Sequence, residues 1–180
     1  MKEYNFENGV IVGRFEPLHI GHQKLIEIAL SNCKTVLVFI TTNITKDKNN
    51  PFDFSYKSYL FKKIYSYEIK NERIILENFV NNIEFNHTYG KALLEKSNNI
   101  LNDKINCIIY GSDKDISKCF CKSDINDLSQ IKINRNIIKT SSTLVRKLLL
   151  KKDINRLKEV LDVKLYGEID KMINIVCKYY

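Results

Sequence analysis

Two histidines close together in the sequence, His19 and His22, are the side chains whose type and spacing point most directly to chemistry. They belong to the segment GRFEPLHIGH at residues 13–22, which also carries Arg14 and places Gly21 between the two imidazoles. Residues at this spacing face the same side of a helix if its first turn includes them. The free N–H groups at a helix N-terminus attract phosphate. Together with the imidazoles and Arg14, they predict a loop that binds a triphosphate.

Gly13 and Pro17 indicate that this segment is a turn between a strand and a helix. Gly13 follows the apolar run at residues 10–12, and its missing Cβ lets a ligand or a neighbouring backbone approach. Pro17 fixes φ before the helix. The sequence contains neither the P-loop pattern GxxxxGK[ST] nor the dinucleotide pattern GxGxxG. Two histidines often form a metal pair, but the loop has one carboxylate, Glu16, and the only other histidine is His87, so we expect no protein-bound metal.

A second group of phosphate-binding residue types lies far downstream, in the segment TSSTLVR at residues 140–146. Ser142 and Thr143 have hydroxyls that can cap a helix or donate hydrogen bonds to phosphate oxygens. Arg146 follows Ser142 by one helical turn, which places its guanidinium on the same face as that hydroxyl. Taken alone, such a helix start is usually only a cap. Combined with the first segment, it predicts a second phosphate clamp.

The apolar pattern predicts the elements that position these two segments. Residues 35–40 form an almost continuous apolar run, which is typical of a strand buried on both faces of a parallel sheet. Strands are predicted at residues 10–12, 35–40, 74–76 and 105–110, and helices at 25–30, 56–67, 89–101 and from 142 onward. The alternation predicts an α/β fold with a doubly wound open parallel sheet, whose ligands bind beyond the carboxyl ends of the strands. We expect one domain over residues 1–180, with a helical C-terminal part from about residue 141.

Composition limits the possible classes of partner. The net charge of +8 suits polyphosphate substrates and nucleic acid equally, and the lysines are spread over every segment, so we do not expect nucleic acid as a partner. Apolar runs stay below the roughly 18 residues of a membrane span, which predicts a cytoplasmic protein without a membrane partner. The five cysteines include no CxxC pair, so we expect reduced thiols.

The pairing of GRFEPLHIGH with SSTLVR resembles the HxGH nucleotidyltransferase superfamily, which shares its His-Ile-Gly-His signature with class I aminoacyl-tRNA synthetases. The chain has no KMSKS segment and is too short for a synthetase with tRNA-binding domains. Within the superfamily, the form GRFxPxHxGH is most similar to nicotinamide-mononucleotide adenylyltransferases of the archaeal type. The resemblance implies the Rossmann-like HxGH nucleotidyltransferase fold and spans most of the chain.

The resemblance also implies an ATP site and a reaction without a covalent enzyme intermediate. The acceptor phosphate attacks the α-phosphorus of ATP, pyrophosphate leaves, and Mg²⁺ accompanies the triphosphate. The side chains expected to act in catalysis are His19, His22, Arg14 and Arg146. The residues expected to bind ATP are Gly13, Arg14, Phe15, His19, Gly21, His22, Gly111, Asp113, Ser142, Thr143 and Arg146.

Two further segments resemble the acceptor site of the same family. Asn50-Pro51-Phe52 is similar to its NPFT segment, with Asp53 in place of the Thr and Lys57 where an Arg is usual. Residues 83–89 resemble the segment that ends in a Trp stacked on the nicotinamide ring, with Tyr89 in the Trp position. Tyr89 is equally well explained as a core aromatic. The residues expected to bind the acceptor are Phe52, Lys57, Phe85, Asn86 and Tyr89.

We therefore expect an adenylyltransferase that joins ATP to nicotinamide or nicotinate mononucleotide. ATP and a phosphate-bearing small molecule are the expected partners, and a homo-oligomer is expected. One alternative is another HxGH enzyme, either a pantetheine-phosphate adenylyltransferase or a cytidylyltransferase. The other is a nucleotide-binding regulator without turnover, against which the retention of both histidines and Arg146 argues.

Overall fold

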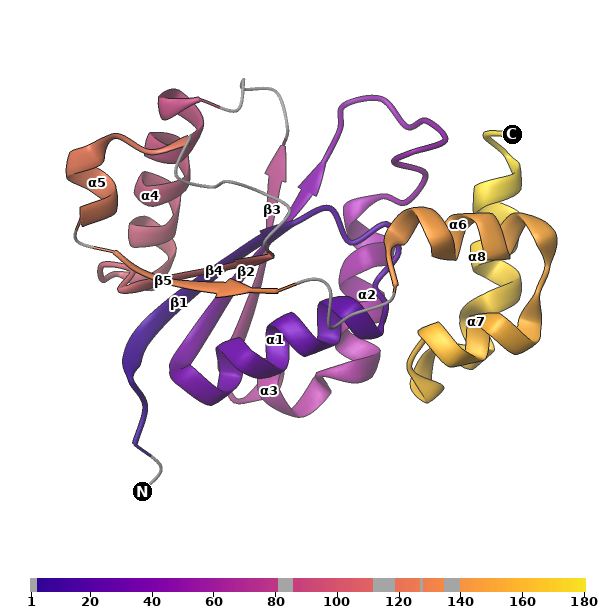
Figure 1. Cartoon of the computed structure of the whole chain (residues 1–180), viewed down its shortest axis with the longest axis horizontal. Helices are drawn as coiled ribbons and strands as arrows, with labels where there is room; N and C mark the ends of the chain where they lie inside the picture. The colour runs from indigo at the N-terminus through magenta and orange to yellow at the C-terminus, as the bar shows by residue number, and fades with distance from the viewer. Residues whose placement is uncertain (1–2, 81–85, 112–118, 127, 135–139) are drawn as a thin grey trace.

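The apolar segments of the sequence form the strands of a parallel β-sheet. The computed structural model describes residues 3–80, 86–111, 119–126, 128–134 and 140–180 (Figure 1). Within these residues the strands are β1 (Phe6–Gly13), β2 (Cys33–Thr42), β3 (Ile74–Val80), β4 (Cys107–Gly111) and β5 (Ser129–Ile133). Their order across the sheet is β3-β2-β1-β4-β5, and each neighbouring pair is parallel.

The direction in which the sheet grows reverses at β1. The chain first proceeds from β1 through β2 to β3, and then continues on the other side of β1 with β4 and β5. Val10 of β1 pairs with Leu37 of β2 on one side and with Ile108 of β4 on the other. Ligands of open parallel sheets bind beyond the carboxyl ends of the strands at such a switch point. The ends of β1 and β4, at Gly13 and Gly111, are therefore where a ligand is expected.

Helices cover both faces of the sheet. Those described are α1 (Ile20–Asn32), α2 (Phe54–Ile64), α3 (Ser66–Lys70), α4 (His87–Leu101), α5 (Lys122–Asn126), α6 (Ser142–Lys151), α7 (Ile154–Val160), the 3-10 helix η3 (Val163–Glu168) and α8 (Ile169–Cys177). Figure 1 shows α1 and α3 on one side of the sheet, and α4 and α5 on the other. None of the helices in the described part of the chain is long and apolar enough to cross a membrane.

Neighbouring residues of β2 contribute to two different hydrophobic clusters. Val36, Val38 and Ile40 pack in a cluster with α1, α2 and the C-terminal helices. Leu37 and Phe39 pack in a second cluster, with α4. All five side chains are fully buried, and burying each one contributes about 1.5–3 kcal/mol. This double burial explains why residues 35–40 are continuously apolar and do not alternate with polar residues.

The C-terminal helices extend the first cluster beyond the sheet. Leu148 of α6, Leu157 of α7 and Met172 of α8 are all buried in the same cluster as β1 and α2. Between α1 and the start of η3, Gln23 Nε2 donates a hydrogen bond of 2.6 Å to Asp162 Oδ2. In Figure 1 these helices lie side by side at one end of the molecule. The packing holds α6, which carries the second predicted phosphate clamp, in a defined position relative to α1.

The predicted α/β architecture is confirmed, with three differences in the elements. The edge strand β5 was not predicted, because its sequence SQIKI is largely polar and only Ile133 is buried. The short helix α5 was not predicted either, since its five residues show no apolar period. The helix predicted over residues 56–67 is divided at Tyr65 into α2 and α3.

Gly90 provides a test of the packing of α4. A Cβ added at Gly90 would collide with the carbonyl oxygen of Cys119, whereas one added at Gly167 meets no atom within 4 Å. A collision with main chain cannot be relieved by rotating a side chain. We therefore expect Gly90→Ala to lower the free energy of unfolding, measured with urea, by roughly 1–3 kcal/mol. Gly167→Ala is the matched control and should not lower it, because Ala also restricts the unfolded chain. Equal effects of the two changes would contradict this packing.

Candidate active site

The turn between β1 and α1 brings the two predicted histidines together. His19 is the N-cap of α1, with extended backbone, and its Nδ1 accepts a hydrogen bond of 3.0 Å from the N–H of Gly21. The rings of His19 and His22 are stacked with centroids 3.8 Å apart. Because Nδ1 of His19 is an acceptor, a neutral imidazole carries its proton on Nε2, which is then a donor. The expectation that both imidazoles face the same way agrees with this geometry.

The histidines form part of a pocket at the switch point of the sheet. The pocket is small, with a volume of about 40 Å³. It is lined by His19, Gly21, His22, Leu25, Gly111, Ile133 and Thr140. These residues come from the start of α1, the ends of β4 and β5, and the segment before α6. Leu25 and Ile133 were not predicted, because Ile133 lies in the unpredicted β5 and Leu25 resembles any core residue of a helix. Thr140 belongs to the segment predicted as the second phosphate clamp, although its own side chain was not among the residues expected to bind ATP.

Phe15 packs behind the pocket and explains the need for Gly13. Its φ of 51° is in the left-handed region, which is uncommon for a residue with a bulky side chain. The Phe15 ring is buried and packs edge-on against Phe61 at 4.9 Å and against His22 at 4.8 Å. A Cβ on Gly13 would lie 2.8 Å from that ring. The Phe15 ring thus occupies the space beside Gly13, where the sequence had suggested a ligand or a neighbouring backbone.

Lys57 lies beneath this loop, fully buried with its side chain at 0% exposure. Its Nζ donates to Glu16 Oε1 at 2.7 Å, to the carbonyl of Thr41 at 2.9 Å and to that of Arg14 at 3.0 Å. These three acceptors match the three donors of an ammonium group. The predicted contact of Lys57 with an acceptor molecule is therefore at odds with the structure, because the protein itself surrounds the ammonium group.

Burial shifts both members of this pair towards their neutral forms. It raises the pKa of Glu16, while the charge and the hydrogen bond of Lys57 oppose the change. It also lowers the pKa of Lys57, against the attraction of Glu16. The second carboxylate oxygen of Glu16 accepts a hydrogen bond of 3.2 Å from the N–H of Phe52. A buried charge with this many partners is a fixed part of the structure.

Arg146 joins the second predicted segment to the first. It is buried, and its Nη1 donates a hydrogen bond of 2.9 Å to the carbonyl of Glu16. Its Nη2 lies 3.5 Å from Thr143 Oγ1, so the nearest hydroxyl belongs to Thr143 and not to Ser142. The N-cap of α6 is Ser141, whose Oγ accepts from the N–H of Leu144. Within the described residues, Arg146 Nε is buried and makes no hydrogen bond.

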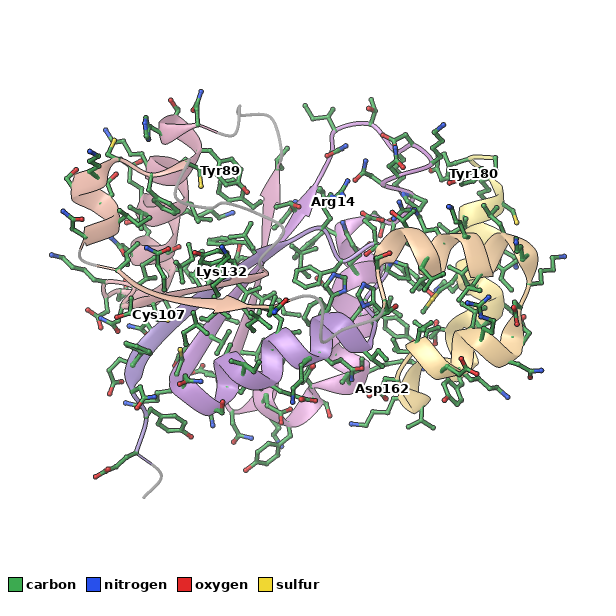
Figure 2. All side chains as sticks on the ribbon, in the orientation of Figure 1. Arg14, Tyr89, Cys107, Lys132, Asp162 and Tyr180 are labelled. Atoms are coloured by element: carbon green, nitrogen blue, oxygen red, sulfur yellow. The ribbon has the colours of Figure 1, made fainter. Side chains whose placement is uncertain are left out.

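Arg14 and the hydroxyls of α6 complete the polar rim. Arg14 is exposed at the end of β1, as Figure 2 shows. Ser142 is half-buried and Thr143 is exposed at the first turn of α6. Both motifs predicted to bind phosphate therefore lie at the same end of the sheet, joined by the contact between Arg146 and Glu16. This arrangement presents cations and N–H donors to an anion.

The residues expected to bind the acceptor are mostly found in structural positions. Phe52 is buried and stacks with Tyr56 at 5.7 Å between centroids. Asn86 is the N-cap of α4, where its Oδ1 accepts from the N–H of Thr88. Tyr89 is 5% exposed and packs edge-on against Phe79, which agrees with its interpretation as a core aromatic. Burial raises the pKa of Tyr89 to about 12. Phe85 and Asp113 lie outside the described residues.

The described residues offer no ready-made metal site. Among them, no group of three or more His, Cys, Asp or Glu side chains is placed to hold an ion. Glu16, the only carboxylate of the loop, is already bound by Lys57 and by the N–H of Phe52. A cation at this site would be held by the phosphate oxygens of the ligand and by water, as Mg²⁺ usually is.

Comparison with known proteins assigns the chain to a family. The sequence pattern of the family described as cytidylyltransferase-like matches residues 10–152. The chain therefore belongs to this family, whose members share the HxGH nucleotidyltransferase signature found at residues 19–22. The assignment supports a nucleotidyltransferase and leaves the acceptor open.

One curated relative and several solved structures extend the comparison. The chain is 29% identical, over 186 residues, to a bifunctional riboflavin kinase/FMN adenylyltransferase of Buchnera aphidicola subsp. Schizaphis graminum; the match covers 89% of this chain and 56% of the relative. The chain also superposes on the structure of a bifunctional NMN adenylyltransferase/ADP ribose pyrophosphatase from Francisella tularensis, complexed with AMP and Mn ion. The TM-score is 0.74 at 17% identity, and the superposition covers 97% of this chain and 52% of that one. With the nicotinic acid mononucleotide adenylyltransferase of Plasmodium falciparum the TM-score is 0.61 at 20% identity, covering 97% and 96%. The chain thus spans about half the length of the first two proteins.

Asp53 tests the electrostatics beside the site. It is the N-cap of α2, so its replacement of the family Thr exchanges one capping residue for another. Partial burial raises its pKa, but hydrogen bonds from the N–H of Tyr56 and from Lys46 outweigh this and hold the pKa at about 2. An aspartate with a depressed pKa stabilises the fold above its unfolded pKa of about 3.9 and loses that effect as the pH falls.

We therefore expect wild type to be more stable than Asp53→Asn at pH 6, with the difference disappearing between about pH 4 and pH 2. Asn keeps an acceptor oxygen for the cap but does not titrate in this range. Urea unfolding of both proteins at pH 6, 4 and 3 measures the effect. A difference in stability that is the same at all three pH values would contradict it.

Proposed function

We propose that this protein transfers AMP from ATP to a nicotinoyl mononucleotide, forming NAD or its deamido form and pyrophosphate. The observation that carries the proposal is the hydrogen bond from Arg146 to the carbonyl of Glu16. It joins the late Arg segment to the loop that presents His19 and His22, so two phosphate-binding motifs act on one ligand. The family assignment supports nucleotidyl transfer, and the acceptor is the finer part of the proposal.

The reaction needs positioning and charge stabilisation more than proton transfer. An oxygen of the acceptor phosphate forms a bond to the α-phosphorus of ATP, and the bond from that phosphorus to the bridging oxygen of the β-phosphate breaks. Pyrophosphate leaves with the electron pair. The acceptor phosphate is already ionised at neutral pH, so no general base is required. The protein holds the attacking and leaving oxygens in line and stabilises the growing charge.

The side chains divide this work by their chemistry. Nε2–H of His19 and the imidazole of His22 face the triphosphate as donors, beside the N–H groups of the first turn of α1. Arg14 and Arg146 offset the charge of the phosphates from the two sides. Ser142 and Thr143 supply hydroxyl donors at the start of α6. Gly21 has no side chain and so leaves space for a phosphate at the start of α1. Mg²⁺ bound to the triphosphate would neutralise part of its charge.

The apolar side of the pocket is the place that we propose for the nucleoside part of ATP. Leu25 and Ile133 line it together with Gly111 at the end of β4. A flat heterocycle with one apolar face suits such a lining. We place the adenosine there, with the triphosphate extending towards His19 and Arg146, so that the α-phosphorus lies at the switch point of the sheet.

Two observations bear on the acceptor. The segments Asn50-Pro51-Phe52 and Asn86 to Tyr89 resemble the acceptor site of nicotinoyl nucleotide enzymes, and two proteins of similar fold are named as NMN and nicotinic acid mononucleotide adenylyltransferases. The curated relative, named as a riboflavin kinase/FMN adenylyltransferase, favours a second candidate, in which FMN is the acceptor. Either acceptor brings a phosphate on a ribose or ribityl chain to the same α-phosphorus.

A panel of acceptors tests the proposed reaction. Purified protein with Mg²⁺ and either ATP or CTP is offered nicotinamide mononucleotide, nicotinate mononucleotide, FMN, phosphopantetheine or glycerol phosphate, and pyrophosphate release is followed. We expect release with ATP and a nicotinoyl mononucleotide. Release with FMN alone would favour the second candidate and refute the first. No release with any pair would refute transferase activity altogether.

His19→Ala tests the role of the first histidine. If the imidazole contributes more than about 1.4 kcal/mol selectively to the transition state, kcat falls at least about tenfold. His87→Ala is the matched control, because His87 is exposed at the start of α4 and should keep the wild-type rate. A wild-type rate for His19→Ala would show that His19 does not contribute to catalysis.

A further inference from the structure

The ion pair between Glu16 and Lys57 is unusual for this chain because water does not reach it. The two side chains are 2% and 0% exposed, with 2.7 Å between Oε1 and Nζ. The other pairs among the described residues are more exposed; the pair of Lys34 and Glu7, at 2.9 Å, has side chains that are 59% and 64% exposed. A buried pair is stable only where further hydrogen bonds surround both charges. The buried pair therefore fixes the positions of the groups that supply those hydrogen bonds.

The partners of the pair come from separate segments of the chain. Lys57 Nζ holds the carbonyl of Arg14, in the loop after β1, and that of Thr41, near the end of β2. Glu16 Oε2 holds the N–H of Phe52, just before α2. One ion pair thus fixes the β1 loop against the end of β2 and the start of α2.

The same loop residue also positions the late arginine. The carbonyl of Glu16 accepts the hydrogen bond from Arg146 Nη1 at 2.9 Å, across 130 residues of sequence. The hydrogen bond from Lys57 fixes the position of the Glu16 carboxylate, and this also restricts the position of the main-chain carbonyl of Glu16. The guanidinium of Arg146 therefore has a fixed anchor, and the carbonyl of Arg14 is fixed from the other side.

We propose that Glu16 and Lys57 are a positioning pair, which sets the places of Arg146 and of the Arg14 loop for the nucleotide without touching either substrate. The assignment of the nucleotide to this site rests on the proposed function. Lys57 then acts through the protein and not as a ligand of the acceptor phosphate. Loss of either partner leaves the other as an unpaired buried charge, which disturbs the loop.

The proposal predicts a characteristic pattern of ATP affinity in a double-mutant cycle. Glu16→Gln and Lys57→Met each leave one charge buried without its counter-charge, and each should weaken ATP binding, measured by calorimetry, at least about tenfold. The double variant Glu16→Gln/Lys57→Met removes both charges, so it should bind ATP no more weakly than the worse single variant. Lys34→Met, which breaks the exposed pair, is the matched control and should bind ATP as wild type does.

Calorimetry needs no acceptor and no turnover, so the positioning pair is tested even if the proposed reaction is wrong. Circular dichroism and the fitted number of ATP sites show that each variant is folded. If the single variants do not fold, Glu16→Asp, which keeps the charge but shortens its reach by one methylene, must weaken ATP binding while folded. Where the acceptor panel gives turnover, kcat should fall with little change in KM for the acceptor.

Three results would overturn the proposal. Multiplicative effects of the two single changes in the double variant would show that the residues act independently. A Lys57→Met protein with unchanged ATP affinity and a raised KM for the acceptor would place Lys57 on the acceptor. Folded Glu16→Gln or Glu16→Asp proteins with wild-type affinity would show that the loop keeps its place without the pair.

Discussion

Most of the site depends on the way in which one loop residue, Glu16, is held. Its carboxylate is buried against the ammonium group of Lys57 and the N–H of Phe52, and its carbonyl anchors Arg146. A carboxylate and an ammonium group are costly to remove from water, so their burial is possible only with partners on all sides. Those partners are main-chain groups of three segments, namely the loop after β1, the end of β2 and the residues before α2. The buried carboxylate of Glu16 therefore also restricts the conformation of the loop after β1.

The sheet explains why these segments meet. β1 lies at the centre of the order β3-β2-β1-β4-β5, and the chain leaves it in opposite directions before and after the switch point. The loop after β1 therefore faces the end of β4 across a crevice, with the N-terminus of α1 pointing into it. The C-terminal helices share a hydrophobic cluster with β1 and α2, which holds α6 and Arg146 against the loop. Packing positions the elements, and the polar contacts of Glu16 then fix the side chains.

The sequence predicts those parts of the structure that depend on local pattern. Continuous apolar runs predict the central strands, and the spacing of His19 and His22 predicts that the imidazoles lie together at a helix N-terminus, as they do at 3.8 Å. The sequence does not predict β5, because this edge strand is largely polar and contains no apolar run. Nor does it predict the partner of Lys57, because no local spacing relates Glu16 to a residue 41 positions away. Gly13 was predicted to let a ligand or a neighbouring backbone approach, but the structure shows that the Phe15 ring occupies that space.

In the proposed reaction ATP donates its α-phosphoryl group, with the nucleoside attached, and not its γ-phosphoryl group. Parallel reactions with ATP labelled with phosphorus-32 at the α or at the γ position, each with nicotinamide mononucleotide, measure this directly after separation of the products. The proposed chemistry predicts that the α label appears in a dinucleotide and that the γ label appears in pyrophosphate. Transfer of the γ label to the acceptor, or no labelled product from either reaction, would contradict it.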